Sequence, residues 1–231
     1  IVLQATYINY CSFTNNEGTV GNSGVLDAYF LSSSNVYEHV KITNSVFTQN
    51  VTNKRLIGSI RNATISENSF TDSGYVQIIG KNTTTTNNVF TNVDSAWSNG
   101  AILAEIEDGN HLISNNLIKN TTGSGIAVAF QYWNPATITI TNNTIIGNTN
   151  YGIRLYNSNG GDSSQTVNIT NNSIVDNNRG ALYLDEELLH INVSYNRLHN
   201  NNNTNNSADH GTAIYSRYGD RTIFEYNTVT G

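Results

Sequence analysis

The sequence predicts an all-β solenoid, a stack of about eight or nine coils built from short strands. The main observation is one recurring phrase: an aliphatic residue, a polar residue, an Asn pair or near-pair, a variable residue and a second apolar residue, as in ITNNTI from Ile140. A phrase repeated every few tens of residues indicates a solenoid. The last apolar residue recurs every 20 to 34 residues, at Phe13, Phe47, Phe70, Phe90, Ile118, Ile145, Ile174, Leu198 and Val229. Because the repeat length varies, the pattern favours short strands joined by loops of different length over packed helix pairs, which would fix the length.

A second motif predicts one more strand in most coils. Each copy is a run of four to seven mostly apolar residues bounded by Asn, Gly and Ser, which is typical of strands and too short for helices. Alternation places Ile126 and Val128 inward with Ala127 outward, and it places Arg154 outward in the next copy. The runs are GVLDAYFL from Gly24, GYVQIIG from Gly74, GAILAEI from Gly100, GIAVAF from Gly125, GIRLY from Gly152, GALYL from Gly180 and GTAIYS from Gly211. In GAILA and GALYL either register fits the pattern.

Stacked coils predict a ladder of Asn side chains. At the strand spacing of roughly 4.8 Å the last Asn of each phrase falls above the one before it. An amide carries both donors and an acceptor, so these side chains can bond along the axis, and Asn also tolerates left-handed turns. The predicted ladder is Asn68, Asn88, Asn116, Asn143, Asn172, Asn196 and Asn227. Cys11 and Ser45 occupy this column in the first two coils, so we expect a weaker ladder there and a small buried Cys11.

The repeats resemble the right-handed parallel β-helix repeats of pectate-lyase-like enzymes and of surface proteins. The Phe-x-x-Asn element at Phe13 and Phe47, combined with Gly-led strands at Gly100 and Gly211, is most similar to repeats of polymorphic outer-membrane adhesins and of adhesin-like proteins of methanogenic archaea. The resemblance covers essentially residues 1–231 and implies a single β-helix domain. It implies little about function, because ladder and strand residues build the coil.

The composition predicts a surface that is mainly neutral and polar. Asn makes up forty of the 231 residues, only 12% of residues are charged, and the net charge is −6. Without a Lys/Arg cluster we expect no nucleic-acid partner. No apolar run approaches the roughly 18 to 20 residues of a membrane helix. Both ends of the sequence fall within the repeat pattern, so we expect a segment of a longer protein. The resemblance to surface proteins implies an extracellular or cell-surface location.

Ten Asn-x-Ser/Thr sequons occur, and a chain rich in these residues generates some by chance. Four of them are Asn142, Asn168, Asn171 and Asn192, of which the first three lie within the repeat phrase and have a structural explanation. The remaining six are candidate glycosylation sites, namely Asn50, Asn62, Asn82, Asn120, Asn202 and Asn205.

The acidic residues gather in two runs, one at Glu105, Glu107 and Asp108 and one from Asp185 to Glu187. Aligned on their leading glycines, Glu105 and Asp185 lie three coils apart, roughly 14 Å. That exceeds the roughly 5 to 10 Å of a glycosidase carboxylate pair. Such acidic side chains suit Ca²⁺ as a cofactor, because it takes hard oxygen ligands. Asp185, Glu186 and Glu187 are its candidate ligands, although a solvated acidic turn explains them as well.

A further candidate for catalysis is Asp209 with His210, followed by Arg217. A His between Asp and Gly resembles the His motif of polygalacturonases, and the base of pectate lyases is an Arg. The Asn-Thr-Asp and Asp-Asp motifs that should accompany the polygalacturonase His are missing. We therefore expect no catalysis by these residues.

Aromatic residues supply the candidate ligand-binding positions. Trp97, Tyr132 and Trp133 fall in neighbouring loops, where flat rings beside amides suit a sugar-binding surface. Stacking along the coil is the alternative explanation for them. We favour that structural explanation for the tyrosines near strand ends, Tyr156, Tyr183, Tyr215 and Tyr218.

The sequence therefore favours a non-enzymatic adhesin-like segment that contacts surface glycans or proteins of another cell. The alternative is a uronate-polymer lyase, hydrolase or epimerase, because the resemblance also covers enzymes that concentrate Asp, Lys and Arg on three adjacent coils. Only 11 Lys and Arg occur, thinly spread, which favours the adhesin. A third hypothesis is a self-assembling surface protein, since unpaired strand edges can pair with another copy.

Overall fold

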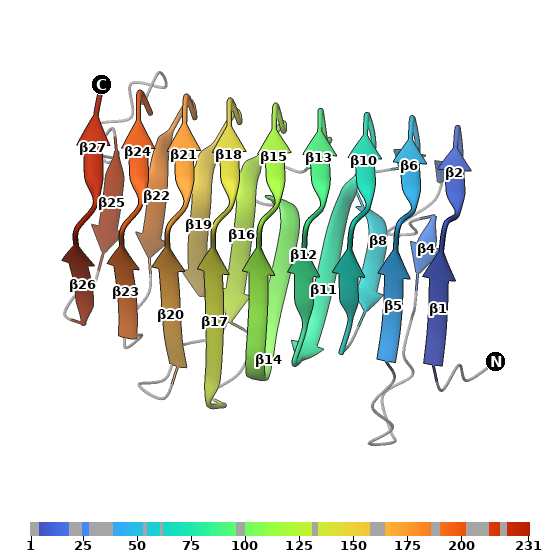
Figure 1. Ribbon diagram of the computed structural model, residues 1–231, viewed down its shortest axis with the longest axis horizontal. Coiled ribbons are helices and arrows are strands. Elements are labelled where there is room, and N and C mark those ends of the chain that lie inside the picture. The colour runs from blue at the N-terminus through green and yellow to red at the C-terminus, as the bar shows by residue number, and fades with distance from the viewer. Residues whose placement is uncertain are drawn as a thin grey trace.

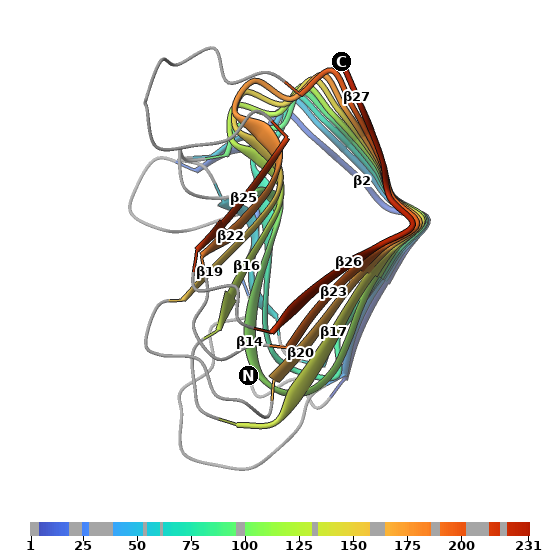
Figure 2. The same cartoon turned by 90° about the vertical axis from the view of Figure 1, so that its left-hand side faces the viewer.

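The computed structural model describes residues 5–18, 25–27, 39–52, 55–60, 62–95, 100–130, 134–157, 165–185, 190–201, 213–217 and 221–231. Every regular element in these ranges is a β-strand, and strands of successive repeats lie side by side in parallel (Figure 1). The predicted all-β parallel solenoid is confirmed. Seen along its axis, the stack has three sides (Figure 2), which we call the upper, lower and rear sheets after Figure 1.

The upper sheet contains nine strands, and each carries the last apolar residue of a repeat phrase. Phe13 pairs with Phe47, Phe47 with Phe70 and Phe70 with Phe90, so the variable spacing in sequence becomes one exact-register column in space. The loops absorb the differences in length. The strands are β2 (Ser12–Thr14), β6 (Val46–Thr48), β10 (Ser69–Thr71), β13 (Val89–Thr91), β15 (Leu117–Lys119), β18 (Thr144–Ile146), β21 (Ser173–Val175), β24 (Arg197–His199) and β27 (Thr228–Thr230).

The lower and rear sheets share β14 (Gly100–Ser114), which turns from one into the other. The lower sheet also contains β1 (Ala5–Asn9), β5 (His39–Thr43), β9 (Thr64–Ser66), β12 (Thr84–Thr86), β17 (Ala136–Thr141), β20 (Gln165–Thr170), β23 (His190–Ser194) and β26 (Thr222–Glu225). The rear sheet also contains β4 (Leu26–Asp27), β8 (Arg55–Ile60), β11 (Tyr75–Lys81), β16 (Ser124–Phe130), β19 (Tyr151–Asn157), β22 (Gly180–Asp185) and β25 (Ile214–Arg217). A separate short pair is formed by β3 (Glu17–Gly18) and β7 (Val51–Thr52).

Apolar columns fill the coil. Four phenylalanine rings stack at the N-terminal end with centroids 4.8, 4.9 and 4.6 Å apart, and Ile118 continues the same column. The rear sheet also resolves the two ambiguous registers. In GALYL, Leu182 and Leu184 face inward and are fully buried, while Tyr183 faces out. In GAILA, Ile102 pairs with the inward Ile126.

The predicted Asn ladder is confirmed at the corner between the lower and upper sheets. It runs unbroken from Asn68 to Asn227, and each side chain donates an N–H to the Oδ1 of the next Asn at 3.0 Å. Ser45 continues the column, because its N–H donates to Asn68 and its Oγ accepts from the Cys11 N–H. Cys11 holds the expected position but is exposed, so the prediction that it is buried was wrong.

A second ladder lies at the far end of the upper sheet and was not predicted. Asn148 donates to Asn177 at 2.7 Å, and Asn177 donates to Asn201 at 2.8 Å. At the N-terminal end Asn16 donates to Asn50 at 2.8 Å. The column is interrupted between these two segments, where Ser73, Val93 and Thr121 replace Asn.

Candidate binding face on the rear sheet

The outward positions of the rear sheet carry several of its described charged and aromatic side chains. Inward aliphatic residues, such as Ile153 and Leu155, fix which side chains point out. Pairing between strands then aligns two outward columns. One contains Gln77, Leu103, Ala127, Arg154, Tyr183 and Tyr215, and the other contains Ile79, Glu105, Ala129, Tyr156, Asp185 and Arg217.

The C-terminal half of these columns forms what we call the aromatic–ionic cluster. The rings of Tyr183 and Tyr215 stack along the coil, as predicted from the sequence, with centroids 4.9 Å apart and planes 15° apart. The guanidinium of Arg154 lies 4.7 Å from the ring centroid of Tyr156 and 5.4 Å from that of Tyr183, distances at which cation–π attraction operates. The cluster lies on β19, β22 and β25 and consists of Arg154, Tyr156, Tyr183, Asp185, Tyr215 and Arg217.

Asp185 links the ionic part of this cluster. The Tyr183 hydroxyl donates to its Oδ2 at 2.9 Å, and Nη1 of Arg217 lies 3.8 Å from its Oδ1. Burial, together with the hydrogen bond to Asp185 and its negative charge, raises the pKa of Tyr183 to about 12. The phenol therefore stays neutral over the physiological range and remains a hydrogen-bond donor to the carboxylate.

A second polar group, which we call the Glu105 cluster, spans β8, β11 and β14. Nη1 of Arg55 donates to Oε1 of Gln77 at 2.7 Å, and the Gln77 side chain hydrogen-bonds Glu105. Burial raises the pKa of Glu105, the nearby Glu107 carboxylate adds to this rise, and Gln77 and Arg55 oppose it. On β14, Ile106 and Asp108 pair with consecutive residues of β11, so Glu107 between them is the extra residue of a bulge. A carboxyl group with a raised pKa beside a second acid is a candidate acid–base group.

The two clusters are separated by a strip of apolar residues. Leu103, Ala127 and Ala129 occupy outward positions yet are at most 3% exposed. Glu105 and Asp185 lie in one column three strand steps apart, with Ala129 and Tyr156 between them. The separation predicted from the sequence, roughly 14 Å at the usual strand spacing, follows from this register. These two carboxylates therefore do not form one pair.

The structure brings together two residues that the sequence suggested for different roles. Asp185, proposed as a Ca²⁺ ligand, and Arg217, proposed for catalysis, are partners in one ion pair. Within the described ranges no group of three His, Cys, Asp or Glu side chains is arranged to hold a metal ion. Seven other candidates lie outside the described residues, namely Trp97, Tyr132, Trp133, Glu186, Glu187, Asp209 and His210.

The sequons differ strongly in exposure. Asn50 is 1% exposed and belongs to the second ladder, where its Nδ2 donates to the Phe13 carbonyl oxygen, so in this fold its amide is not available to a glycosylating enzyme. Asn62 is 8% exposed. Asn82 and Asn120 are exposed. The remaining candidates, Asn202 and Asn205, lie outside the described residues.

Sequence reasoning missed Arg55 and Gln77 and gave Arg154 no role beyond facing outward. A signal was present for Arg154, since it is a charged residue in the outward position of an apolar strand. Arg55 and Gln77 meet Glu105 only because three strands with different loop lengths come into register.

Comparison with known proteins agrees with this architecture. A family model described as a right-handed β-helix region matches residues 3–163. Comparisons with curated proteins and with solved structures give no match. In the part of the chain that the structure describes, no helix has the length and apolar character needed to span a membrane. With more than half of its length matched by the family model, the chain belongs to the right-handed β-helix family.

Proposed function

We propose that this chain is a non-enzymatic, adhesin-like segment of an extracellular or cell-surface protein, and that the aromatic–ionic cluster contacts glycans or proteins of another cell. The observation that carries the proposal is the stack of Tyr183 on Tyr215 with Arg154 beside it. The stacked tyrosines present apolar ring edges and hydroxyls to a sugar, and guanidinium and carboxylate groups suit sugar hydroxyls. A rigid sheet holds these groups without an ordering cost on binding.

The chemistry of the cluster supports binding more than bond cleavage. It contains one carboxylate, Asp185, which already accepts the Tyr183 hydroxyl and pairs with Arg217. A glycosidase needs two carboxylates about 5 to 10 Å apart, one of them free to take or give a proton. The resemblance of the repeats to adhesin repeats points in the same direction.

The test is a glycan array probed with the wild-type chain and with Tyr215→Ala. Loss of the stacked ring should weaken binding about tenfold, the upper range of an aromatic contact. Tyr226→Ala is the matched control, because Tyr226 also stacks on a tyrosine, Tyr195, but at the opposite corner. Equal loss in both variants, or no binding by the wild type to any glycan or extracellular protein, would contradict the proposal.

A second candidate function, cleavage of a polysaccharide, is favoured by the Glu105 cluster. Glu105 and Glu107 lie two residues apart on β14, and the Glu107 carboxylate acts on the pKa of Glu105, so the two acids are neighbours. A glycosidase needs such a neighbouring pair, with its carboxyl groups about 5 to 10 Å apart. The raised pKa of Glu105 suits a general acid. Turnover of a uronate polymer that Glu105→Gln abolishes and Tyr215→Ala spares would establish the enzyme and overturn the binding proposal.

Ca²⁺ and self-association stay predictions. Repeating the array with Ca²⁺ and with a chelator tests the metal, which should affect binding only if residues near Asp185 hold it. Sedimentation at increasing concentration tests homotypic association, and a strict monomer would argue against pairing through strand edges.

A further inference from the structure

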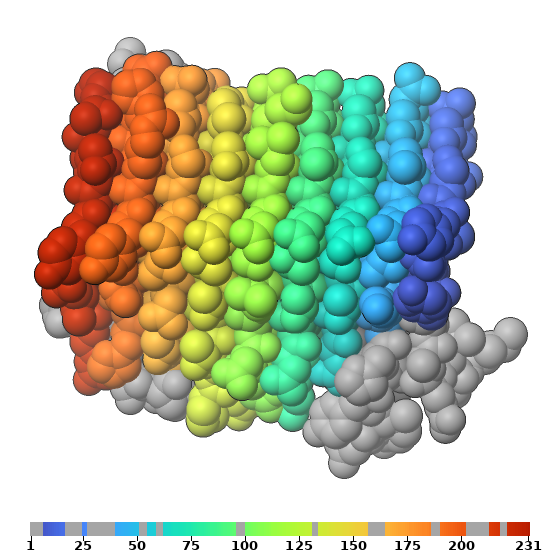
Figure 3. Space-filling view, viewed as in Figure 1, coloured from blue at the N-terminus to red at the C-terminus, as the bar shows by residue number. Residues whose placement is uncertain are grey.

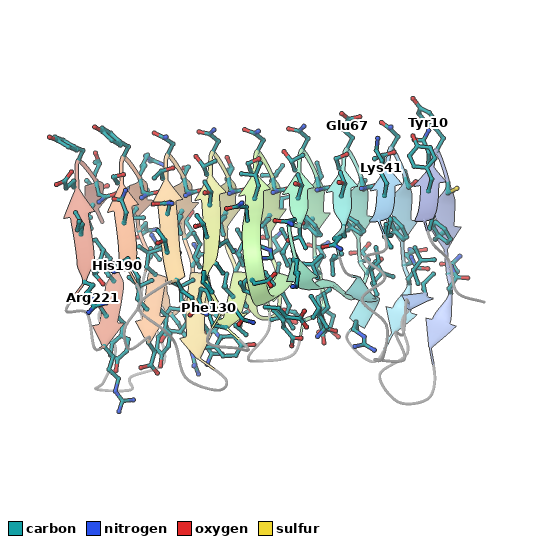
Figure 4. All side chains as sticks on the ribbon, turned by 90° about the horizontal axis from the view of Figure 1, so that it is seen from below. Tyr10, Lys41, Glu67, Phe130, His190 and Arg221 are labelled. Atoms are coloured by element: carbon teal, nitrogen blue, oxygen red, sulfur yellow. The ribbon has the colours of Figure 1, made fainter. Side chains whose placement is uncertain are left out.

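The ladder corner carries a column of residues whose backbone makes the turn of each coil and whose side chains point outward. Each member directly precedes a ladder position and has a positive φ between 50° and 59°, which turns the chain and aims the side chain away from the axis. Tyr10 and Glu67, both in this column, project from the corner (Figure 4). The column is Tyr10, Asn44, Glu67, Asn87, Asn115, Asn142, Asn171, Tyr195 and Tyr226. Within it, Asn142 and Asn171 begin sequons.

These two sequons present their acceptor groups outward. Asn142 is exposed, the next residue is the buried ladder Asn143, and Thr144 begins β18 at an outward position. The amide and the hydroxyl that define the sequon therefore point to the same side. Asn171 and Ser173 repeat this arrangement one coil later. Both side chains are exposed, and neither amide hydrogen-bonds another of the described residues, so both are available for reaction.

The amide side chains of the other described sequons are buried, half-buried or already hydrogen-bonded. Asn50 and Asn62 are buried. Oδ1 of Asn82 accepts the Asn110 N–H at 2.9 Å, and Nδ2 of Asn120 donates to Asn92 at 3.4 Å. The last two, Asn168 and Asn192, are half-buried and face each other across strands of the lower sheet.

We propose that Asn142 and Asn171 are the N-glycan acceptors of the folded chain. The proposal rests on the extracellular location in the proposed function, and its co-substrate is a glycan linked to a lipid pyrophosphate. The amide nitrogen forms a bond to the anomeric carbon and loses one proton, while the bond from that carbon to the pyrophosphate oxygen breaks and the lipid pyrophosphate leaves.

The geometry allows one glycan on the pair. The backbone N–H of Asn142 donates to the Thr170 carbonyl oxygen at 3.2 Å, and Thr144 pairs with Ser173, so the two acceptors lie on directly adjacent coils. Their backbones are therefore about 4.8 Å apart. A glycan of several sugars is wider than this spacing and blocks its neighbour.

The position also suits a protein that binds through its rear sheet. The ladder corner is the outer edge where the upper and lower sheets meet, and the rear sheet lies on the opposite side of the coil (Figure 2). Face-on, successive coils form a continuous wall with this corner column crossing it (Figure 3). A glycan there covers the wall and leaves the aromatic–ionic cluster open to a partner.

The test treats the purified folded chain with an oligosaccharyltransferase that acts on folded proteins and a lipid-linked oligosaccharide, followed by peptide mass spectrometry. We expect one glycan per chain, shared between Asn142 and Asn171. Thr144→Ala should move all of it to Asn171, and adding Ser173→Ala should abolish it. Thr84→Ala, which removes the sequon at Asn82, is the matched control and should change nothing.

Two results would overturn the proposal: glycan found mainly at another sequon, or none on the folded chain while a synthetic peptide of residues 140–146 accepts it in the same reaction. Glycans on both Asn142 and Asn171 of the same chain would contradict the expectation that a glycan on one of them blocks the other. Because the glycan array uses unmodified protein, a failure here is distinguishable from a failure of the binding proposal.

Discussion

One oxygen atom of Asn116 joins two coils, because its Oδ1 accepts both the backbone N–H and the side-chain N–H of Asn88 at 3.0 Å. Both residues are almost completely buried. Nδ2 of Asn116 in turn donates to the Thr85 carbonyl oxygen and to Asn143. Each ladder side chain thus satisfies buried backbone groups as well as its neighbours in the column.

Asn116→Ala should therefore destabilise the chain by about 2 to 4 kcal/mol, because it leaves the buried backbone N–H of Asn88 without its acceptor and removes the side-chain bonds to Asn88, Asn143 and the Thr85 carbonyl oxygen. The measurement is urea unfolding followed by circular dichroism. The matched control is Asn115→Gly at the neighbouring exposed position, where φ is 55° and glycine is tolerated. Similar losses in the two variants would show that the turn, rather than the ladder, holds the corner.

The phenylalanine stack predicts a graded response to truncation. Phe70 is fully buried between Phe47 and Phe90. Phe70→Ala should lower the free energy of unfolding by about 3 to 5 kcal/mol, because it removes buried apolar surface and leaves a cavity. Phe70→Ile should cost about 1 to 2 kcal/mol, because isoleucine already fills this column at Ile118 and Ile145. Thermal unfolding of the two variants checks this order, and an isoleucine variant as unstable as the alanine variant would contradict it.

The fold was predictable because the repeat phrase records local turn chemistry. Asn115 adopts the left-handed conformation of the turn, and Asn116 makes the hydrogen bonds of the buried ladder. Both requirements recur in every coil. The second ladder escaped prediction because Ser73, Val93 and Thr121 interrupt it in the middle of the stack. Its Asn residues therefore do not recur in every repeat.

The candidate site was less predictable for a different reason. Arg154, Tyr183 and Asp185 meet because outward positions of neighbouring strands align, and that alignment depends on register across loops of unequal length. Sequence alternation gives the outward direction of each residue but not its neighbour on the next coil. The sequence therefore gave no reason to place Arg217, 32 residues after Asp185, beside it.

His111 predicts a pH-dependent stability. It lies inside the coil, 3% exposed, with Nε2 donating to the Asp108 carbonyl oxygen at 2.7 Å and Nδ1 lying 2.9 Å from the Thr83 hydroxyl, from which it accepts. Burial lowers the pKa of His111 below its usual 6.5, although Asp108 opposes this. His111 therefore binds a proton more readily in the unfolded chain than in the folded chain. The stability that the neutral, buried His111 contributes is complete above about pH 6.5, and it is lost as the pH falls toward the lower folded-state pKa.

The variant that checks this is His111→Ile combined with Thr83→Val, which continues the apolar column occupied by Ile138 on the next coil. Urea midpoints at pH 7.5 and pH 5 should fall less in the double variant than in the wild type. The pKa of Glu105 is shifted in the opposite direction, so only the difference between the two proteins at each pH isolates His111. Parallel pH profiles would contradict the prediction.

Asp185 should control the ionisation of Tyr183. Burial is the largest cause of the pKa of about 12, followed by the hydrogen bond to Asp185 and its charge. Asp185→Asn removes the charge and leaves the burial, so the pKa of Tyr183 should fall but stay above the ordinary value of about 10. Ultraviolet titration of phenolate absorbance, compared with Tyr183→Phe to assign the transition, measures this shift. An unchanged transition would mean that the hydrogen bond at 2.9 Å does not persist in solution. The cluster would then lose the fixed geometry that its proposed binding role requires.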